Sequence, residues 1–247
     1  MHAPSFGRGL RVLSILSVLT LVTSFALVFF YAPNDADQGF VQKIFYVHVP
    51  LAIVALVGFL VGGFYGALYL WKGDRGHDLK SYVAIHQSVI MGVGVLATGS
   101  LWARASWGHW WVWGEPTLVS FLIVFLLFAM YWPLRFSIDD PERQARFAAV
   151  FAVIGAAFTF VNFLAVRLAQ SAAPHPEVLM TAEGGMPAPM MNTFLLALVG
   201  MALLYITLWK YELTSKHATM RVRSLKRRLA GDEALAPLGR SAAPQHL

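Results

Sequence analysis

The 247-residue chain has no cysteine and few charged side chains. Without cysteine it forms no disulfide, binds no metal through a thiolate and attaches no cofactor through a thioether. Asp, Glu, Lys and Arg make up 13% of the residues, whereas roughly 25% is usual for a soluble domain. Hydrophobic residues make up 57%, and the mean hydropathy is +0.60. This balance excludes an ordinary soluble domain and favours a protein of the lipid bilayer.

Two sequence patterns are also missing. The chain has no glycine-rich phosphate loop ending in Gly-Lys-Ser or Gly-Lys-Thr, so any ATPase activity is expected in partner subunits. No segment shows the alternation of apolar and polar residues that is typical of a transmembrane β-strand. These absences leave a helical membrane protein with no nucleotide site of its own as the expected class.

Six apolar stretches are long enough to cross the roughly 30 Å hydrocarbon core of a bilayer, which takes about 20 helical residues. Lipid offers the backbone no hydrogen-bond partner, and a helix satisfies its own backbone groups. We therefore predict an all-α, polytopic membrane protein with six transmembrane helices. The first stretch is longer than the apolar part of a cleavable signal peptide, so we expect it to remain as an anchor. The six helices are expected at about Leu10–Tyr31, Phe45–Trp71, Ser81–Ala103, Thr117–Phe136, Ala145–Val166 and Met190–Trp209.

The distribution of Lys and Arg predicts the orientation. Of the 19 such residues, all but Lys43, Arg104 and Arg167 lie at one set of helix ends or in the C-terminal tail. Positive residues mark the cytoplasmic side, so both the N and C termini are expected in the cytoplasm. The net charge of +6 is then a topology signal, and no nucleic acid is expected as a partner. The basic stretch Arg221 to Arg228 is suited to contact with anionic membrane lipid.

These features divide the chain into two parts. Residues 1–215 are expected to form the membrane domain, with a tryptophan-rich outer segment at 104–120. Residues 216–247 are expected to form a basic, flexible cytoplasmic tail. Within the second stretch, Gly58, Gly62 and Gly66 recur at four-residue spacing, which predicts close packing against a neighbouring helix.

The most unusual segment runs from Trp107 to Pro116 and holds four of the eight tryptophans. Such a density of indoles, interrupted by glycine and histidine, suits a platform for a flat, apolar ligand. The alternative is an aromatic belt, because tryptophan collects at the membrane interface in many membrane proteins. The predicted topology puts this segment on the outer side.

Three histidines also fall on the outer side: His48, His109 and His175. Two neutral imidazoles on opposite sides of an aromatic shelf are what axial ligation of haem iron requires. The three outer cations named above would then be candidate partners for the haem propionates. The alternatives are hydrogen-bonded structural histidines and arginines that reach to the interface. The residues thus favour haem or a similar planar cofactor, without excluding those structural roles.

The segment from Trp107 to Trp113 resembles the WWD signature of haem-handling proteins. Together with residues 43–50 (KIFYVHVP) and 97–102 (ATGSLW), it makes the chain similar to the cytochrome c maturation protein C family (CcmC, haem exporter protein C). The resemblance covers about residues 40–209. Two departures are visible: Gly114 stands where the family has Asp, so that Glu115 is expected to take the acidic place, and the stretch before His175 lacks the family's tryptophans.

The resemblance implies a haem site on the periplasmic face of the bacterial inner membrane. Haem b would be bound non-covalently and transiently, with His48 and His175 as the axial ligands, and would be delivered to the periplasmic haem chaperone CcmE. Further partners would be the small subunit CcmD and the ABC module CcmA and CcmB. The protein would not be a conventional enzyme and would have no catalytic residues. The cofactor-binding set would be Trp107, Gly108, Trp110, Trp111, Trp113, Glu115, Arg104 and Arg167.

Other functions predict different features. A cytochrome c synthase-like WWD protein would generally be larger. A secondary transporter without haem would be expected to place polar groups near the bilayer midplane, whereas His86, Gln87 and Asn162 lie nearer the helix ends. A cytochrome b-like electron carrier would need facing pairs of histidines within the helices, and the stretches lack such pairs.

Overall fold

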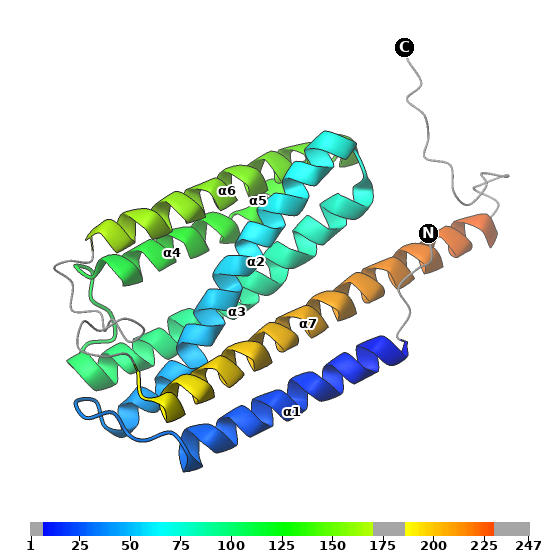
Figure 1. Ribbon diagram of the computed structural model, residues 1–247. Coiled ribbons are helices and arrows are strands. Elements are labelled where there is room, and N and C mark those ends of the chain that lie inside the picture. The colour runs from blue at the N-terminus through cyan, green and yellow to red at the C-terminus, as the bar shows by residue number, and fades with distance from the viewer. Residues whose placement is uncertain (1–6, 170–185, 230–247) are drawn as a thin grey trace.

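The computed structural model describes residues 7–169 and 186–229, and within them it is built from helices (Figure 1). The six helices predicted from hydropathy are confirmed, since six helical segments are long and apolar enough to cross a membrane. The chain is thus an all-α, multi-pass membrane protein. The elements are α1 (Arg8–Phe30), the 3-10 helix η1 (Phe40–Ile44), α2 (Phe45–Lys72), α3 (Arg75–Trp107), α4 (Pro116–Ala129), α5 (Tyr131–Phe136), α6 (Pro141–Ala169) and α7 (Ala188–Leu229).

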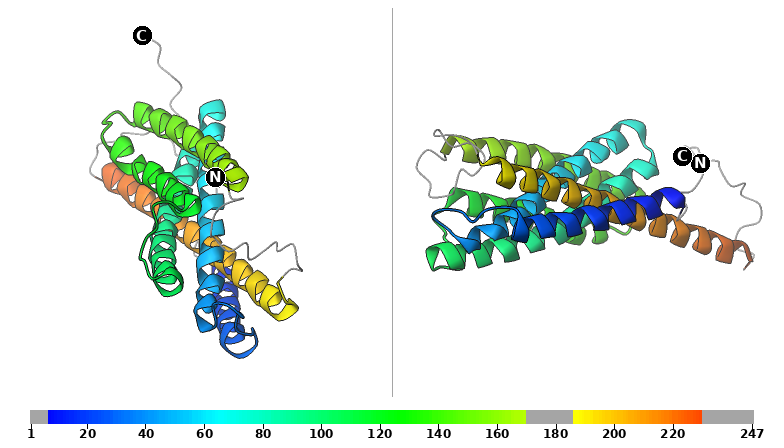
Figure 2. Two further views of the ribbon diagram at one scale, coloured as in Figure 1. Left: turned by 90° about the vertical axis from the view of Figure 1, so that its left-hand side faces the viewer. Right: turned by 60° about the horizontal axis from the view of Figure 1, so that its bottom comes forward.

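The helices run alternately up and down, so the bundle has two ends. We call the end where α1 finishes, α2 begins and α3 passes into α4 the tryptophan end. The opposite end, where α1 begins and α7 finishes, is called the basic end. Figures 1 and 2 show that the start of α1 and the last turns of α7 lie toward this same end. An even number of spans requires this arrangement.

The helix α2 lies at the centre of the packing, with α3 and α6 along it. Its glycines permit the close approach that their spacing predicted. A Cβ at Gly62 would lie 2.6 Å from Ile85 Cγ1 on α3, and a Cβ at Gly63 would lie 2.2 Å from Ala156 Cβ on α6. Two adjacent glycines therefore let α2 contact a different helix on each side.

The fourth predicted span is divided into α4 and α5. Pro133 lies inside α5, where it has no N–H to donate to the carbonyl of Ala129 and its ring crowds that turn. Ala129 is the last residue of α4. The break thus follows from a proline that hydropathy alone does not weigh.

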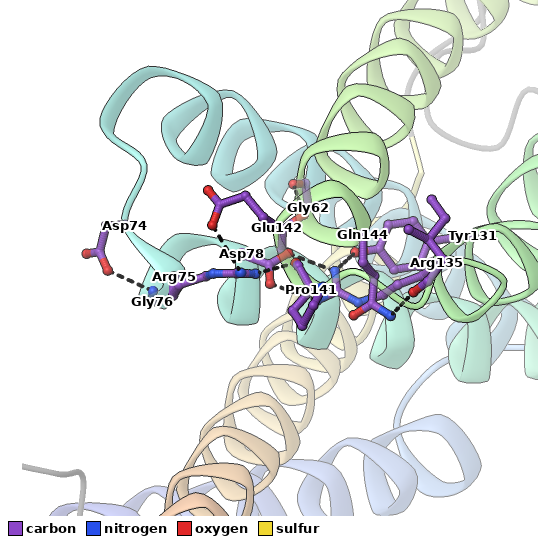
Figure 3. A network of polar contacts seen from close by, with 12 residues as sticks. Gly62, Asp74, Arg75, Gly76, Asp78, Tyr131, Arg135, Pro141, Glu142 and Gln144 are labelled. Carbon is purple, nitrogen blue, oxygen red and sulfur yellow. Dashed lines mark hydrogen bonds and ion pairs between the residues drawn. The ribbon is translucent and has the colours of Figure 1, made fainter. Parts of the chain in front are cut away.

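A polar network holds the basic end together (Figure 3). Two nitrogens of Arg135 on α5 each donate to an oxygen of Asp78 on α3 at 2.7 Å, and Arg135 also donates to the Tyr131 hydroxyl at 2.9 Å. Arg75 donates to the Pro141 carbonyl at 2.8 Å. Because the Arg135 and Asp78 side chains are only 10% and 9% exposed, this bidentate pair fixes α5 against α3.

The last helix is longer than predicted. The 42 residues of α7 extend about 63 Å at 1.5 Å per residue, roughly twice the hydrocarbon thickness of a bilayer. The helix continues through Leu229, so the boundary expected at residue 215 does not coincide with a helix end. The first part of the expected tail, up to Leu229, is helical and carries the basic stretch Arg221 to Arg228.

Candidate functional site

His48 lies on the first turns of α2, at the tryptophan end, and its imidazole is hydrogen-bonded to α3. Its Nδ1 lies 2.9 Å from the Thr98 hydroxyl oxygen, and that hydroxyl in turn lies 2.8 Å from the Gly94 carbonyl. A hydroxyl has one proton, and the carbonyl can only accept it. When the Thr98 hydroxyl gives its proton to the Gly94 carbonyl, its oxygen accepts from His48 Nδ1–H. In that arrangement the lone pair of the neutral imidazole is on Nε2, the nitrogen that would bind a metal.

Two further residues of α3 fix the imidazole ring. A Cβ at position 99 would lie 2.9 Å from His48 Cε1, so only glycine lets the ring lie this close to the helix. Trp102 meets His48 edge to face, with ring centroids 5.7 Å apart and planes at 78°. The Trp102 indole N–H donates to Gln38 Oε1 at 2.8 Å. Trp102 is thus held from the connection that precedes α2.

A buried apolar cluster lies beneath this arrangement. It joins the end of α1, the start of α2, α3 and the start of α7. Met186, where the described chain resumes, also packs against the cluster. The segment that carries His175 lies outside the described residues. Met186 follows that segment, and the cluster against which it packs includes Trp102, which contacts His48. The buried members of the cluster are Val28, Ala32, Phe45, Tyr46, Trp102, Met190 and Phe194.

The tryptophan segment leaves α3 through Gly108. This residue has φ +77° and ends the helix, a left-handed conformation that glycine adopts without strain. Beyond it, Trp110 and Trp113 are 58% and 73% exposed. Trp111 is half-buried and meets Trp113 edge to face at 5.9 Å. The segment thus presents exposed indoles beside the helix that carries the His48 contacts.

The predicted acidic residue has a structural contact. Glu115 is 1% exposed and caps α4, where its Oε2 accepts from the Leu118 N–H at 2.7 Å. The following Pro116 begins the helix, a position where the missing N–H costs nothing. The role of Glu115 in binding a cofactor stays a prediction, and capping is a role that the sequence analysis missed.

The Lys and Arg side chains at the tryptophan end differ in their exposure to solvent. Lys43 is buried and donates to the carbonyls of Ala32 and Pro33, so it stabilises the turn after α1. Arg104 is exposed and donates to the Gly108 carbonyl. Arg167 lies near the end of α6, and its side chain is outside the described part of the structure. Of the two cations whose side chains are described, Arg104 is the one that solvent reaches.

This arrangement suits a flat ligand that contains a metal. It combines a hydrogen-bonded imidazole, exposed indole faces and an exposed guanidinium at one end of the bundle. Among the contributors, sequence reasoning did not assign roles to Thr98, Gly99 and Gln38. Thr98 and Gly99 lie in the ATGSLW segment that carries part of the family resemblance, which was the available signal.

The family model described as Heme exporter protein C matches residues 3–228. The chain belongs to the Heme exporter protein C family. A Heme exporter protein C from Rhodobacter capsulatus is 28% identical over 228 residues, covering 90% of this chain and 92% of that protein. One from Bradyrhizobium diazoefficiens is 32% identical and covers 79% and 74%. One from Escherichia coli is 32% identical over 146 residues, 58% of each chain. Membership confirms the resemblance and favours the exporter over the larger synthases.

Proposed function

We propose that this protein handles haem in cytochrome c biogenesis, binding it non-covalently at the tryptophan end and delivering it to the chaperone CcmE. The observation that carries the proposal is the His48–Thr98–Gly94 hydrogen-bond chain. It orients an imidazole for metal binding beside an exposed tryptophan segment, in a chain whose relatives are named for heme export.

The residues divide into three tasks. His48 provides one axial nitrogen through Nε2, and we assign the second axial position to His175 on the family resemblance. Trp107, Trp110, Trp111 and Trp113 provide apolar surface for the porphyrin, with Gly108 shaping the turn. Arg104 and Arg167 attract the propionates, and Glu115 holds the start of α4 next to the indoles.

The exposure of the tryptophan segment suits the delivery of haem to a second protein. Because Trp110 and Trp113 are mostly exposed, a haem lying on them keeps one edge within reach of a second protein. The protein therefore binds and orients its cargo, while the reactivity of the haem is a property of the cargo and the acceptor. The excess of Lys and Arg at the opposite end supports a periplasmic position for the tryptophan end in the inner membrane.

The same orientation indicates where each partner would contact the protein. CcmE would approach the tryptophan end, and the ABC module of CcmA and CcmB would supply ATP hydrolysis from its own subunits. The single-helix subunit CcmD would contact the bundle within the membrane. We take haem b as the cargo on the family resemblance; the chain has no cysteine to which a haem could be attached through a thioether.

Haem content of the purified full-length protein tests the proposal. The protein made in haem-replete cells should show Soret absorbance, and the variant with both His48→Ala and His175→Ala should lose the part of it that comes from haem bound at the tryptophan end. His109→Ala is the control, because His109 is an exposed histidine of the tryptophan segment that is not among the proposed ligands. Equal haem in the double variant and the parent protein, or no haem in the parent protein after addition of haemin, would overturn the proposal.

Exposed indoles should contribute to affinity. Trp110→Ala or Trp113→Ala is expected to weaken haemin binding by about 2- to 10-fold, the effect of losing roughly 0.5–1.5 kcal/mol of aromatic contact. Trp71→Ala is the control, because Trp71 is 81% exposed at the basic end of α2. Titration of haemin into detergent-solubilised protein gives the affinities. Equal losses at Trp71 and Trp110 would assign the indoles to the membrane belt.

A further inference from the structure

A second imidazole is fixed by a hydrogen bond in the half of the bundle toward the basic end. His86 on α3 has its Nδ1 2.7 Å from both carboxylate oxygens of Glu212 on α7. Gln87 Nε2 donates to Glu212 Oε2 at 2.6 Å. The Glu212 side chain is 12% exposed. A carboxylate is thus oriented by one side-chain amide and directed at a single nitrogen of the imidazole.

The contact with Glu212 indicates which ring nitrogen of His86 carries a proton. A carboxylate only accepts hydrogen bonds, so Nδ1 carries the proton and the lone pair of the neutral ring is on Nε2. Within the described residues, the hydrogen bonds of His86 use Nδ1, and its side chain is 30% exposed. Histidines that bind metals usually donate their other N–H to a carboxylate or carbonyl in this way.

Two aromatic rings contact His86, and a cation lies over one of them. Trp132 on α5 meets it edge to face with centroids 5.3 Å apart, and Tyr82 lies nearly parallel to it at 5.9 Å. Lys216 on α7 places its Nζ 5.0 Å from the centre of the Tyr82 ring. The tryptophan end has the same kinds of group: an imidazole, aromatic faces and a cation that could pair with a haem propionate.

The site is separate from that of His48. Thr98, the partner of His48, lies 12 residues beyond His86 on α3, about 18 Å along the helix axis. Two nitrogens bound to one metal ion at about 2 Å each lie much closer together. One haem therefore cannot use both histidines at once.

We propose that His86 is an axial ligand for a second haem-binding position, an acceptance site in the half of the protein toward the basic end. Glu212 and Gln87 orient its imidazole, Trp132 and Tyr82 contact the porphyrin, and Lys216 attracts a propionate. With the orientation proposed above, this site faces the cytoplasmic leaflet. Ionisable groups are costly within the membrane and commonly mark sites of function.

The test uses the full-length protein with His48→Ala and His175→Ala, so that these two histidines at the tryptophan end cannot bind the iron. Ferric haemin is titrated into the detergent-solubilised variant and followed by its Soret band. We expect one saturable haem whose binding weakens at least 10-fold on addition of His86→Gln. We expect Glu212→Gln to weaken it by about 10- to 100-fold, the usual effect of removing a group that orients a metal ligand.

Three controls separate ligation from folding. His86→Gln keeps an amide N–H that can donate to Glu212, so the contact between α3 and α7 is preserved without an imidazole. His217→Ala removes a half-buried histidine of α7 outside the cluster and should leave binding unchanged. Added imidazole should restore the spectrum of haem-loaded His86→Gly, which a purely structural role would not produce.

Two results would overturn the proposal: no haemin binding by the His48 and His175 double variant, or binding that His86→Gln leaves unchanged. A different result is expected if His48 and His175 do not bind haem at the tryptophan end. The double variant would then bind haem as well as the parent protein, and all binding would depend on His86.

Discussion

His48 and Thr98 form a unit of two residues on two helices. The Thr98 hydroxyl oxygen lies 2.9 Å from His48 Nδ1 and 2.8 Å from the Gly94 carbonyl. With the Thr98 proton on that carbonyl, Nε2 is the nitrogen that we propose as the iron ligand. His48 was identifiable from the sequence because it lies on the predicted outer side, in the KIFYVHVP segment that carries part of the family resemblance. Its partner was not, because the two are 50 residues apart and only the packing of α2 on α3 brings them together.

Thr98→Val should weaken haem binding by about 10-fold or more, because loss of a group that orients a metal ligand typically costs 10- to 100-fold. The side-chain volume stays nearly the same, so the fold should be retained. Thr159→Val is the matched control, since Thr159 on α6 donates to its own i−4 carbonyl at 2.8 Å away from the site. Haemin titration measures both. Equal affinity in the two variants would show that the threonine does not orient His48.

The helices illustrate what hydropathy predicts and what it misses. The six spans follow from runs of apolar residues, whose burial in lipid depends only on length and composition. The break at Met130 depends on one proline, and the extension of α7 beyond the membrane depends on helix propensity in a polar stretch. The pairing of His86 with Glu212 spans 126 residues, so no local pattern could predict it.

Close packing of α2 is the element-scale feature most easily tested. Gly63→Ala would put a Cβ 2.2 Å from Ala156 Cβ and 2.9 Å from the Ala152 carbonyl oxygen. Overpacking of this kind usually costs about 1–3 kcal/mol, so the thermal transition in detergent should fall by several degrees. Gly9→Ala, with nothing within 4 Å, should be neutral or slightly stabilising because alanine favours helix. Equal transitions would contradict the packing described for α2 and α6.

At the scale of the whole molecule, the two ends of the bundle differ in chemistry. The tryptophan end has exposed indoles, and the basic end has most of the Lys and Arg residues. This asymmetry predicts the orientation in the membrane, which the sequence already indicated through its charge distribution.

The absence of cysteine makes the orientation directly measurable. His109→Cys places a single thiol at the tryptophan end, and Ser137→Cys places one at the basic end; both positions are exposed. In intact cells with a permeabilised outer membrane, a membrane-impermeant maleimide should label Cys at 109 and not at 137. After lysis it should label both. The reverse pattern would place the haem site proposed for the tryptophan end on the cytoplasmic side.

The coordination of haem in the full-length protein shows whether His48 is an axial ligand. Bound haemin should show the low-spin spectrum of iron ligated by two imidazoles, and His48→Ala should convert it to a high-spin spectrum with one protein ligand. The measurement is electron paramagnetic resonance together with visible absorption, on protein with His86→Gln so that one site is observed. An unchanged low-spin spectrum after His48→Ala would contradict the account.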